Sequence, residues 1–387
     1  MTKGEQREAG KILYAVSAAG TALTFLKGQL GYIANAGYVV GLACPPAKDD
    51  RVEQFCADEG VKFLPLNLQR DPGLRADFKA MVEAFLVIGR FSPDIVIAGT
   101  PKASLLTLFA ARVRRVPVRV YLCHGLRYEG YTGPRRYAMR QFERVVSALS
   151  TKVVAVSDSV RAGLVRCKVP TEKVVVLGDG SPNGVDILRF TPVQDSEPAG
   201  DLPEGEFILF VGRLSKDKGL SHLVELAVRL SDVPLVIVGP IEAKSVNEER
   251  LAAQLRELPN VRMLGRRSDV ASLMSRATVL VLPSVREGMP TVLLEAAACG
   301  LPVVAMKATG STDAVERCES GILVEQGDAH AFVDMCRTLL RDDCLRNQFS
   351  QRGRENASRK FAQELVWQRW LEFLEEEWRD VQNRRRL

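Results

Sequence analysis

Two carboxylates and two cations follow apolar segments in the second half of the chain, at positions suited to a phosphorylated ligand. Glu287 and Glu295 are separated by seven residues in SVREGMPTVLLEAAACGLPVVA, residues 284–305. Arg213 and Lys218 follow the apolar run FILFVG, residues 207–212. Two cations at the carboxyl end of a strand can neutralise a diphosphate leaving group as charge builds on it. These residue types therefore predict a site at which a bond to a diphosphate is broken.

The segment between the two glutamates predicts a loop that leads into a helix. Pro290 suits the first turn of that helix, Gly300 its C-terminal cap and Pro302 a position beyond its end. Glu287 would then lie on the loop, and Glu295 about one and a half turns inside the helix. Helical side chains lean toward the N-terminus, so both carboxylates can face one cleft. The free N–H groups of the first turn, with the helix dipole, also suit a diphosphate.

The elements that would position these residues are short apolar runs separated by amphipathic segments. Predicted helices include residues 21–36, 74–90, 135–149 and a long segment from 361 to 378. The predicted strands are residues 11–17, 38–44, 61–66, 93–99, 117–123, 152–157 and 173–178 in the first half, and 207–212, 234–239, 261–265, 278–283, 302–306 and 321–325 in the second. Because these strands are apolar throughout, they predict parallel sheets buried on both faces by helical crossovers.

The number of strands and the length of 387 residues both indicate two domains. Residues 191–205, TPVQDSEPAGDLPEG, are rich in Pro, Gly and acidic residues and predict a linker. We therefore expect an α/β fold with one doubly wound domain over residues 1–193 and a second over 194–370. The carboxyl ends of both sets of strands would surround one central cleft. A final helix, residues 371–387, would pack back toward the first domain.

Four ordered motifs resemble those of the retaining glycosyltransferases of the GT-B fold, specifically family 4. The family hallmark of two glutamates in an E-G-x-P context is matched by residues 287–295, and the Arg and Lys of V-G-R-L-x-x-x-K-G by residues 211–219. VAVSDSV at 154–160 and NGVD followed by Phe at 183–190 match motifs near the end of the family's first domain. The resemblance covers nearly the whole chain and implies two Rossmann-like domains that face a cleft.

The resemblance also implies roles for individual residues toward a nucleotide-sugar donor. Arg213 and Lys218 would hold the diphosphate, Glu295 the ribose hydroxyls and Glu287 the hydroxyls of the sugar. Backbone groups at the start of the helix would meet the phosphates or the sugar, and a second set of residues would border the base or allow close approach in the cleft. The backbone groups are those of Gly288, Met289, Pro290 and Thr291. Gly265 and Arg266 would border the base. Gly239 would allow close approach in the cleft, or it is a simple turn glycine.

His124 is the candidate from the first half of the chain. It follows the predicted strand 117–123 directly, and it matches a family histidine that contacts the donor sugar. It would contribute to catalysis by orienting the sugar or by direct chemistry. Many relatives carry Gly-Gly after the first strand, whereas this chain has only Gly20 there. Gly20 and Asn183 of the NGVD motif are therefore secondary candidates.

Further segments resemble the branch of the family that acts on polyprenyl-diphosphate-linked sugars in surface polysaccharide and glycan assembly. They are FLKGQ at 25–29, HGLR at 124–127 and GDGSPNGVD at 178–186. The resemblance implies retaining transfer of a hexose or N-acetylhexosamine from a UDP-sugar to such an acceptor. The family needs no metal, and we expect neither a metal nor a cofactor, because the chain lacks a DxD-like pair and its eight cysteines form no Cys/His cluster.

Three other classes of protein are weighed against this one. A UDP-sugar epimerase of the same fold would need more acidic groups and histidines in the cleft for proton abstraction. A non-catalytic nucleotide-sugar-binding protein should have lost one of the two cations or two glutamates, and all four are present. A dehydrogenase is not indicated, because no G-x-G-x-x-G follows the first strand.

A basic stretch distinguishes the first half of the chain. Residues 100–170 contain fourteen Lys or Arg against three Asp or Glu. Such a stretch could face an anionic membrane or a phosphorylated substrate, or simply form solvated helix faces. No RNA-binding motif accompanies it, so we expect no nucleic-acid partner. The arginines that could attract a lipid-linked acceptor and an anionic membrane are Arg112, Arg114, Arg115, Arg119, Arg135, Arg136 and Arg140.

The sequence also bears on location. It contains no run of 18 apolar residues that could span a membrane, and its N-terminus lacks the features of a signal peptide. We therefore expect a cytoplasmic protein, peripheral on the inner face of the cell membrane if the basic stretch binds lipid.

Overall fold

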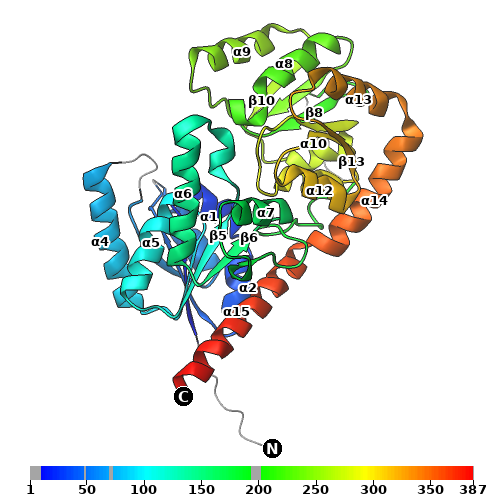
Figure 1. Ribbon diagram of the computed structural model, residues 1–387. Coiled ribbons are helices and arrows are strands. Elements are labelled where there is room, and N and C mark those ends of the chain that lie inside the picture. Colours follow the sequence, from blue (N-terminus) through cyan, green and yellow to red (C-terminus); the bar gives the residue numbers. More distant parts are fainter. Residues whose placement is uncertain (1–9, 48, 69–72, 193–201, 387) are drawn as a thin grey trace, which may run out of the picture.

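The computed structural model describes residues 10–47, 49–68, 73–192 and 202–386, which form two α/β domains and a long C-terminal helix (Figure 1). The first domain contains a seven-stranded parallel sheet in the order β3-β2-β1-β4-β5-β6-β7. Its strands are β1 (Lys11–Ala15), β2 (Val39–Cys44), β3 (Lys62–Pro65), β4 (Ile95–Ala98), β5 (Val118–Cys123), β6 (Lys152–Ala155) and β7 (Val174–Val175).

The second domain contains a six-stranded parallel sheet in the order β10-β9-β8-β11-β12-β13. Its strands are β8 (Ile208–Val211), β9 (Leu235–Val238), β10 (Val261–Gly265), β11 (Val279–Leu282), β12 (Val303–Met306) and β13 (Gly321–Val324). All thirteen strands fall within the segments predicted from the sequence. The prediction succeeds because side chains of the central strands are buried on both faces, which favours continuous runs of Val, Ile and Leu.

Helices cover both faces of each sheet, as expected for doubly wound domains. In the first domain they are α1 (Ala19–Phe25), α2 (Gln29–Asn35), α3 (Arg51–Asp58), α4 (Leu74–Phe91), α5 (Pro101–Val113), α6 (Gly133–Leu149) and α7 (Asp158–Arg166), with 3₁₀ turns η1 (Arg127–Gly130) and η2 (Thr171–Lys173). In the second they are α8 (Leu220–Arg229), α9 (Val246–Glu257), α10 (Val270–Arg276), α11 (Thr291–Ala298), α12 (Ser311–Cys318), α13 (Ala329–Arg341) and α14 (Asp343–Phe361), with η3 (Lys216–Lys218). The helix α15 (Gln363–Arg386) follows α14.

The predicted single helix over residues 21–36 is wrong, because the chain forms the two helices α1 and α2 there. Gly28 separates them with a left-handed φ of 79°. The carboxylate of Glu59 accepts hydrogen bonds from the N–H groups of Gly28 and Gly31, at 2.6 and 2.7 Å. A Cβ on Gly28 would lie 2.4 Å from the ring of Trp367, so the break also provides room for α15. Distant residues therefore replace the helical hydrogen bonds that the local pattern predicts.

The predicted helix over residues 361–378 is also interrupted, at Ala362 between α14 and α15. Ala362 forms an isolated parallel bridge with Val185, in which Val185 N–H donates to Phe361 O at 2.8 Å and Gln363 N–H donates to Val185 O at 3.1 Å. The chain thus leaves the first domain and returns to it at adjacent points. The returning helix begins at Gln363 rather than at residue 371. The predicted boundary between residues 193 and 194 lies outside the described residues, as does most of the predicted linker.

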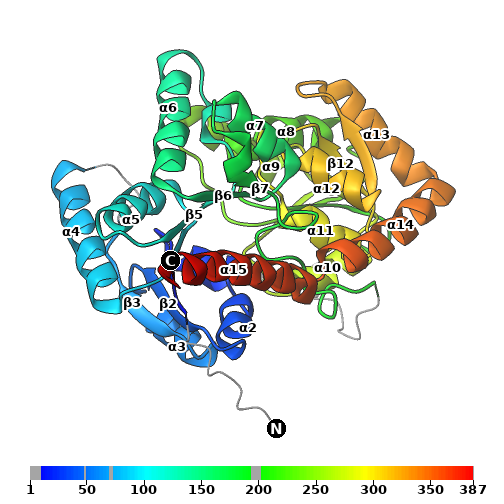
Figure 2. The ribbon, with the colours of Figure 1, turned by 60° about the horizontal axis from the view of Figure 1, so that its bottom comes forward.

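The helix α15 packs on the first domain, beside α2 and on the face of the sheet opposite α4, α5 and α6 (Figure 2). Its apolar side chains Trp370, Phe373, Leu374 and Trp378 are buried. At its far end Glu377 forms an ion pair with Lys152 of β6 at 3.1 Å. Along the chain, the second domain is therefore preceded and followed by segments that belong to the first.

We expect Trp370→Ala to lower the free energy of unfolding by about 3–5 kcal/mol, because the indole is 1% exposed and its removal leaves a cavity under α15. Urea titration followed by circular dichroism measures the loss. Arg379→Ala, at an exposed position of the same helix, is the control and should leave the midpoint nearly unchanged. Equal effects of the two substitutions would show that α15 contributes little to stability.

Candidate active site

A cavity of 670 Å³ lies between the carboxyl ends of the two sheets. The second domain contributes the loops after β8, β9 and β10 and the start of α11, and the first domain contributes α1 and the loops after β4 and β5. Ten of the predicted site residues line it together: His124, Arg213, Lys218, Arg266, Glu287, Gly288, Met289, Pro290, Thr291 and Glu295. Residues from four separate segments of the sequence thus meet at one place, as the strand order requires.

The loop that carries Glu287 is joined to the loop after β8 by an ion pair. The Lys218 ammonium contacts the Glu287 carboxylate, and the two side chains are 18% and 11% exposed. Arg213, which is half exposed, pairs with Glu242 at 2.6 Å between its Nη1 and the Oε2 atom. Both predicted cations are therefore oriented by carboxylates. An anionic ligand in the cavity would compete with those carboxylates for the cations.

Glu295 lies on α11, which begins at Thr291 directly after Pro290 and ends before the left-handed Gly300, as predicted. Burial raises the pKa of Glu295 to about 7, and the positive charge of Arg189 opposes the shift. Since burial disfavours the charged carboxylate, a ligand that donates hydrogen bonds to it would be bound strongly. A pair of ribose hydroxyls is such a ligand.

His124 contributes the first domain's side of the cavity. Burial lowers the pKa of its imidazole to about 4, so the ring is neutral at physiological pH. The ring centroid lies 5.8 Å from that of Phe25 of α1, which lines the same cavity. A neutral imidazole beside an aromatic ring can exchange hydrogen bonds with hydroxyl groups, whereas it cannot supply a charge for the diphosphate.

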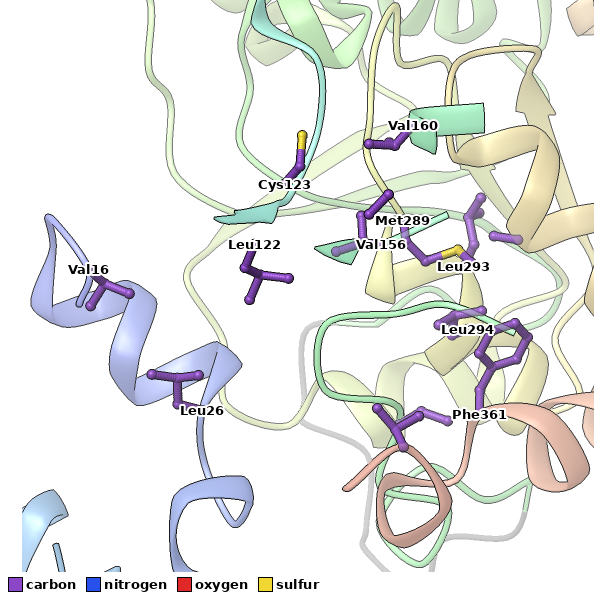
Figure 3. Close-up of a cluster of buried hydrophobic side chains, with 14 of the residues drawn as sticks. Val16, Leu26, Leu122, Cys123, Val156, Val160, Met289, Leu293, Leu294 and Phe361 are labelled. Carbon is purple, nitrogen blue, oxygen red and sulfur yellow. The ribbon is translucent and has the colours of Figure 1, made fainter. Parts of the chain in front are cut away.

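The two halves of the site touch through backbone at Gly288. A Cβ on this residue would lie 1.7 Å from the carbonyl oxygen of His124, so only glycine allows the contact. The Ser157 hydroxyl, at the N-terminus of α7, donates to the Gly288 carbonyl at 2.8 Å. Met289 follows and packs beside Val156 of the first domain in the apolar cluster that Figure 3 shows. The loop that carries Glu287 is therefore fixed against the first domain.

Charged side chains at the outer edge of this contact also join the domains. Arg317 of α12 forms ion pairs with Asp158 and Asp179 of the first domain. The Thr309 hydroxyl donates to Glu129 Oε1 at 2.8 Å, and burial raises the pKa of Glu129. These contacts join α12 and the loop before it to the first domain.

Four predicted site residues lie outside this cavity. Gly239 has φ 139°, and its Cβ would lie 1.9 Å from Gly212 O, so it serves close packing of two backbones at the floor of the cleft. Gly265 has φ 64° and faces open space beside Arg266. Gly20 is an exposed residue of α1 and lines neither this cavity nor the next.

Asn183 is buried and joins three segments of chain. It accepts a hydrogen bond from Trp367 Nε1 at 2.7 Å, and its amide donates to Lys27 O at 3.1 Å. It lines a second cavity, of 610 Å³, which shares Thr24, Phe25, Thr291 and Glu295 with the first. Its contacts make it a support for the loop that follows Phe25.

Sequence reasoning missed several residues of the first domain that line the cavity. They include Thr21, Thr24 and Phe25 of α1 and Thr100 at the start of α5. Thr100 directly follows the predicted strand 93–99. That position, at the carboxyl end of a strand, could have identified it as a residue of the cleft. Arg189, whose charge acts on Glu295, follows the NGVD motif by a few residues and carried no signal of its own.

Within the described ranges, no three His, Cys, Asp or Glu side chains are grouped so that they could hold a metal ion. No described helix is long and apolar enough to cross a membrane. The chemistry that the lining residues can perform is binding of an anion by Arg213, Lys218 and the start of α11, with hydroxyl groups bound by Glu287, Glu295 and His124.

Comparison with protein-family models gives two matches that together cover most of the chain. Residues 194–356 match the model of "Glycosyl transferases group 1", and residues 22–180 match the model of "Glycosyl transferase 4-like domain". The two matched segments correspond to the two domains of the structure.

Individual relatives match over most of their length. The chain is 29% identical over 366 residues to the capsular polysaccharide biosynthesis glycosyltransferase CapM of Staphylococcus aureus, covering 92% of this chain and 95% of CapM. It is 26% identical to the UDP-Gal:alpha-D-GlcNAc-diphosphoundecaprenol alpha-1,3-galactosyltransferase of Escherichia coli, covering 77% of each. The crystal structure of HepE from Anabaena in complex with UDP and glucose superposes with a TM-score of 0.76 at 22% identity, covering 95% of this chain and 99% of HepE.

We expect Glu295→Gln to reduce the dependence of stability on pH. Because burial raises the pKa of Glu295 from 4.5 to about 7, the contribution of its proton to folding is fully present below pH 4.5 and is lost as pH rises through 7. The amide does not titrate, so the variant should lose less of its melting temperature than the wild type between about pH 5.5 and about pH 8.

Calorimetry of both proteins across this range measures the difference. Burial also raises the pKa of Glu143 to about 7, but its effect is common to both proteins and cancels in the comparison. Parallel melting profiles for the two proteins would show that the Glu295 carboxyl is not buried as described.

Proposed function

We propose that this chain, which belongs to the group 1 glycosyltransferases and has their GT-B fold, transfers a hexose or N-acetylhexosamine from a UDP-sugar to a polyprenyl-diphosphate-linked saccharide. The transfer would retain the anomeric configuration, need no metal ion and serve the assembly of a bacterial surface polysaccharide or glycan. The observation that carries the proposal is the ion pair between Lys218 and Glu287 at the start of α11, within reach of Arg213 and Glu295 in one cavity.

The donor diphosphate would bind where the cations and the free N–H groups of α11 converge. Lys218 would exchange its contact with Glu287 for the phosphates, and Arg213 would make a similar exchange from Glu242. This rearrangement leaves the Glu287 carboxylate free to accept hydrogen bonds from the hydroxyls of the sugar. The two partners of the Lys218–Glu287 ion pair would thus each contact one half of the donor, Lys218 the diphosphate and Glu287 the sugar.

The nucleoside would lie over α11 and the loop after β10. Glu295 would accept hydrogen bonds from the ribose, and Arg266 would border the base. The crystal structure of HepE contains UDP, and the E. coli relative is named for a UDP-galactose donor, which supports a UDP-sugar here.

The bond from the sugar C1 to the diphosphate would break as the acceptor hydroxyl approaches the same face of the sugar. The proton of that hydroxyl would pass to the departing phosphate oxygen, whose negative charge Arg213 and Lys218 stabilise. Neutral His124 would orient a sugar hydroxyl rather than remove a proton, because its low pKa makes it a weak base. Such a mechanism requires no covalent intermediate.

The acceptor would enter from the first domain. The two relatives named above act, according to their names, in capsular polysaccharide biosynthesis and on a sugar linked to diphosphoundecaprenol. A lipid-linked acceptor remains at the membrane, and the basic stretch of the first domain provides the charge for peripheral contact with an anionic surface.

A donor screen tests the proposed function. The purified protein is mixed with UDP-, GDP- and ADP-sugars, with and without a short-chain polyprenyl-diphosphate saccharide, and released nucleotide is measured. Acceptor-dependent release of UDP from one sugar is expected, and product analysis by nuclear magnetic resonance should show the retained anomer. Interconversion of the UDP-sugar without acceptor would instead identify an epimerase.

We expect Glu287→Gln to lower kcat by about 10²–10³, because the amide cannot accept the same hydrogen bonds from the sugar as charge develops. Steady-state kinetics with the identified donor and acceptor measure the effect. Glu257→Gln, on the exposed surface of α9, is the matched control and should retain full activity. Near-normal turnover of the Glu287 variant would remove this carboxylate from the catalytic site.

Arg213→Ala and Lys218→Ala should each lower kcat more than they raise KM, because the diphosphate charge grows as the bond to the sugar breaks. The comparison uses the same donor and acceptor for both variants. An increase in KM with unchanged kcat would show that the cations bind the donor without assisting the reaction.

A further inference from the structure

Exposed apolar side chains are concentrated on one face of the first domain. Among the described residues, twelve large hydrophobic side chains are exposed, and seven of them lie on α4, α5 and α6. The remaining five are scattered singly over other elements. Isolated exposed apolar residues are ordinary on protein surfaces, whereas a group on one face indicates a binding surface. The seven are Phe78, Val82 and Leu86 of α4, Phe109 and Val113 of α5, and Tyr137 and Val145 of α6.

The three helices lie side by side on the same face of the sheet (Figure 1). On α4 the apolar residues recur every fourth position, so Phe78, Val82 and Leu86 form one stripe along the helix. Phe109 and Val113 repeat the same spacing on α5. The remaining face of the sheet is covered by α2, α3 and α15 (Figure 2), so α4, α5 and α6 form an outer layer without a further covering layer in the described chain.

Basic side chains surround these apolar residues. The three helices contain nine Lys or Arg, which are Arg75, Lys79, Arg90, Lys102, Arg112, Arg135, Arg136, Arg140 and Arg144. They contain only three acidic residues: Asp77 pairs with Lys102, Glu83 accepts from Asn67 N–H at 3.1 Å and lies 3.9 Å from the exposed Lys79, and Glu143 is buried against the Tyr121 hydroxyl at 2.9 Å. The surface is therefore both apolar and positively charged.

This combination selects among possible partners. A second copy of the chain would bring a like-charged surface against it, which is unfavourable. An anionic bilayer matches both properties, because its headgroups attract the cations and its acyl chains accept the aromatic and aliphatic side chains.

The surface also begins beside the active site. Thr100, which caps α5, lines the cavity, and the loop between His124 and the start of α6 leaves the same cavity. Phe78 and Tyr137 are each the fifth residue of their helix, α4 and α6, near the N-terminal ends that follow the carboxyl ends of β3 and β5. A membrane in contact with the three helices would therefore present lipid headgroups close to the cleft.

We propose that the face formed by α4, α5 and α6 binds an anionic lipid bilayer, with Phe78, Phe109 and Tyr137 entering the interface and Arg75, Lys79 and Arg135 contacting headgroups. The surface itself is inferred from exposed side chains and charge. Only the reason for membrane contact, a lipid-linked acceptor, rests on the proposed function. The face holds the cleft near the plane in which such an acceptor diffuses.

Two tryptophan substitutions test where the chain meets the bilayer. Phe78→Trp and, as a matched control, Val246→Trp on the exposed part of α9 are mixed with phosphatidylglycerol vesicles that contain brominated acyl chains. The indole at 78 should be quenched and its emission shifted to the blue, while the indole at 246 should not respond. The native Trp367, Trp370 and Trp378 lie on α15, away from this face, and provide an unquenched background. Quenching at 246 and not at 78 would overturn the proposal.

Two triple variants separate the apolar and electrostatic contributions in vesicle flotation. Phe78→Ser with Phe109→Ser and Tyr137→Ser removes the apolar contacts, and Arg75→Glu with Lys79→Glu and Arg135→Glu reverses the charge. Each should weaken binding, the charge variant by about fivefold for every basic residue lost. Val246→Ser with Arg250→Glu and Arg256→Glu, on α9, is the matched control and should bind as the wild type does.

Equal binding of all three triple variants, or equal binding of the wild type to phosphatidylcholine and phosphatidylglycerol vesicles, would overturn the proposal, as would self-association through this face without vesicle binding. Unchanged melting temperatures and UDP binding establish that the variants are folded. Since flotation uses neither donor nor acceptor, an inactive protein that still floats would contradict the proposed function alone. If the protein is active but the apolar and charge variants float with vesicles as well as the wild type does, only this inference is contradicted.

Discussion

The carbonyl oxygen of His124 occupies the space that a side chain on Gly288 would need, and the cleft depends on this contact between two backbones. It brings the loop after β5 to the loop before α11, so residues from two sheets can reach one ligand. Ser157 reinforces the contact through the Gly288 carbonyl. Because Glu287 and Met289 flank the glycine, the position of the Glu287 carboxylate is set by the docking of the domains rather than by either domain alone.

The charges of the site balance one another, and this balance determines how it can respond to a ligand. Lys218 and Arg213 each have a carboxylate partner, and burial raises the pKa of Glu295 to about 7. The low pKa of His124 removes a further charge from the cavity. A diphosphate ester can enter such a site by exchanging partners, without leaving an unpaired charge buried in the protein.

The sequence predicts the strands and the loop-helix unit around Glu287 well, because both depend on local patterns of apolar residues, Pro and Gly. It fails where distant residues decide the local structure. The break at Gly28 requires Glu59 and Trp367, and the interruption at Ala362 requires Val185. The contribution of Phe25 could not be seen either, because it depends on where α1 lies relative to the second domain, which no local pattern encodes. The glycines were hard to assign for a different reason. Gly239 and Gly265 both have positive φ angles, and the sequence does not tell whether a bound ligand or a neighbouring strand requires glycine there.

The paired crossings at Val185 and Ala362 give the chain an unequal architecture. The second domain is an insertion into the first, whose fold is completed only when α15 returns and buries Trp370 against it. Exchange of second domains between relatives would therefore require two junctions, one on each side of the insertion. A chimera joined end to end at the linker would combine the sheet of one parent with the closing helix of the other, and the two surfaces would have to fit without having evolved together.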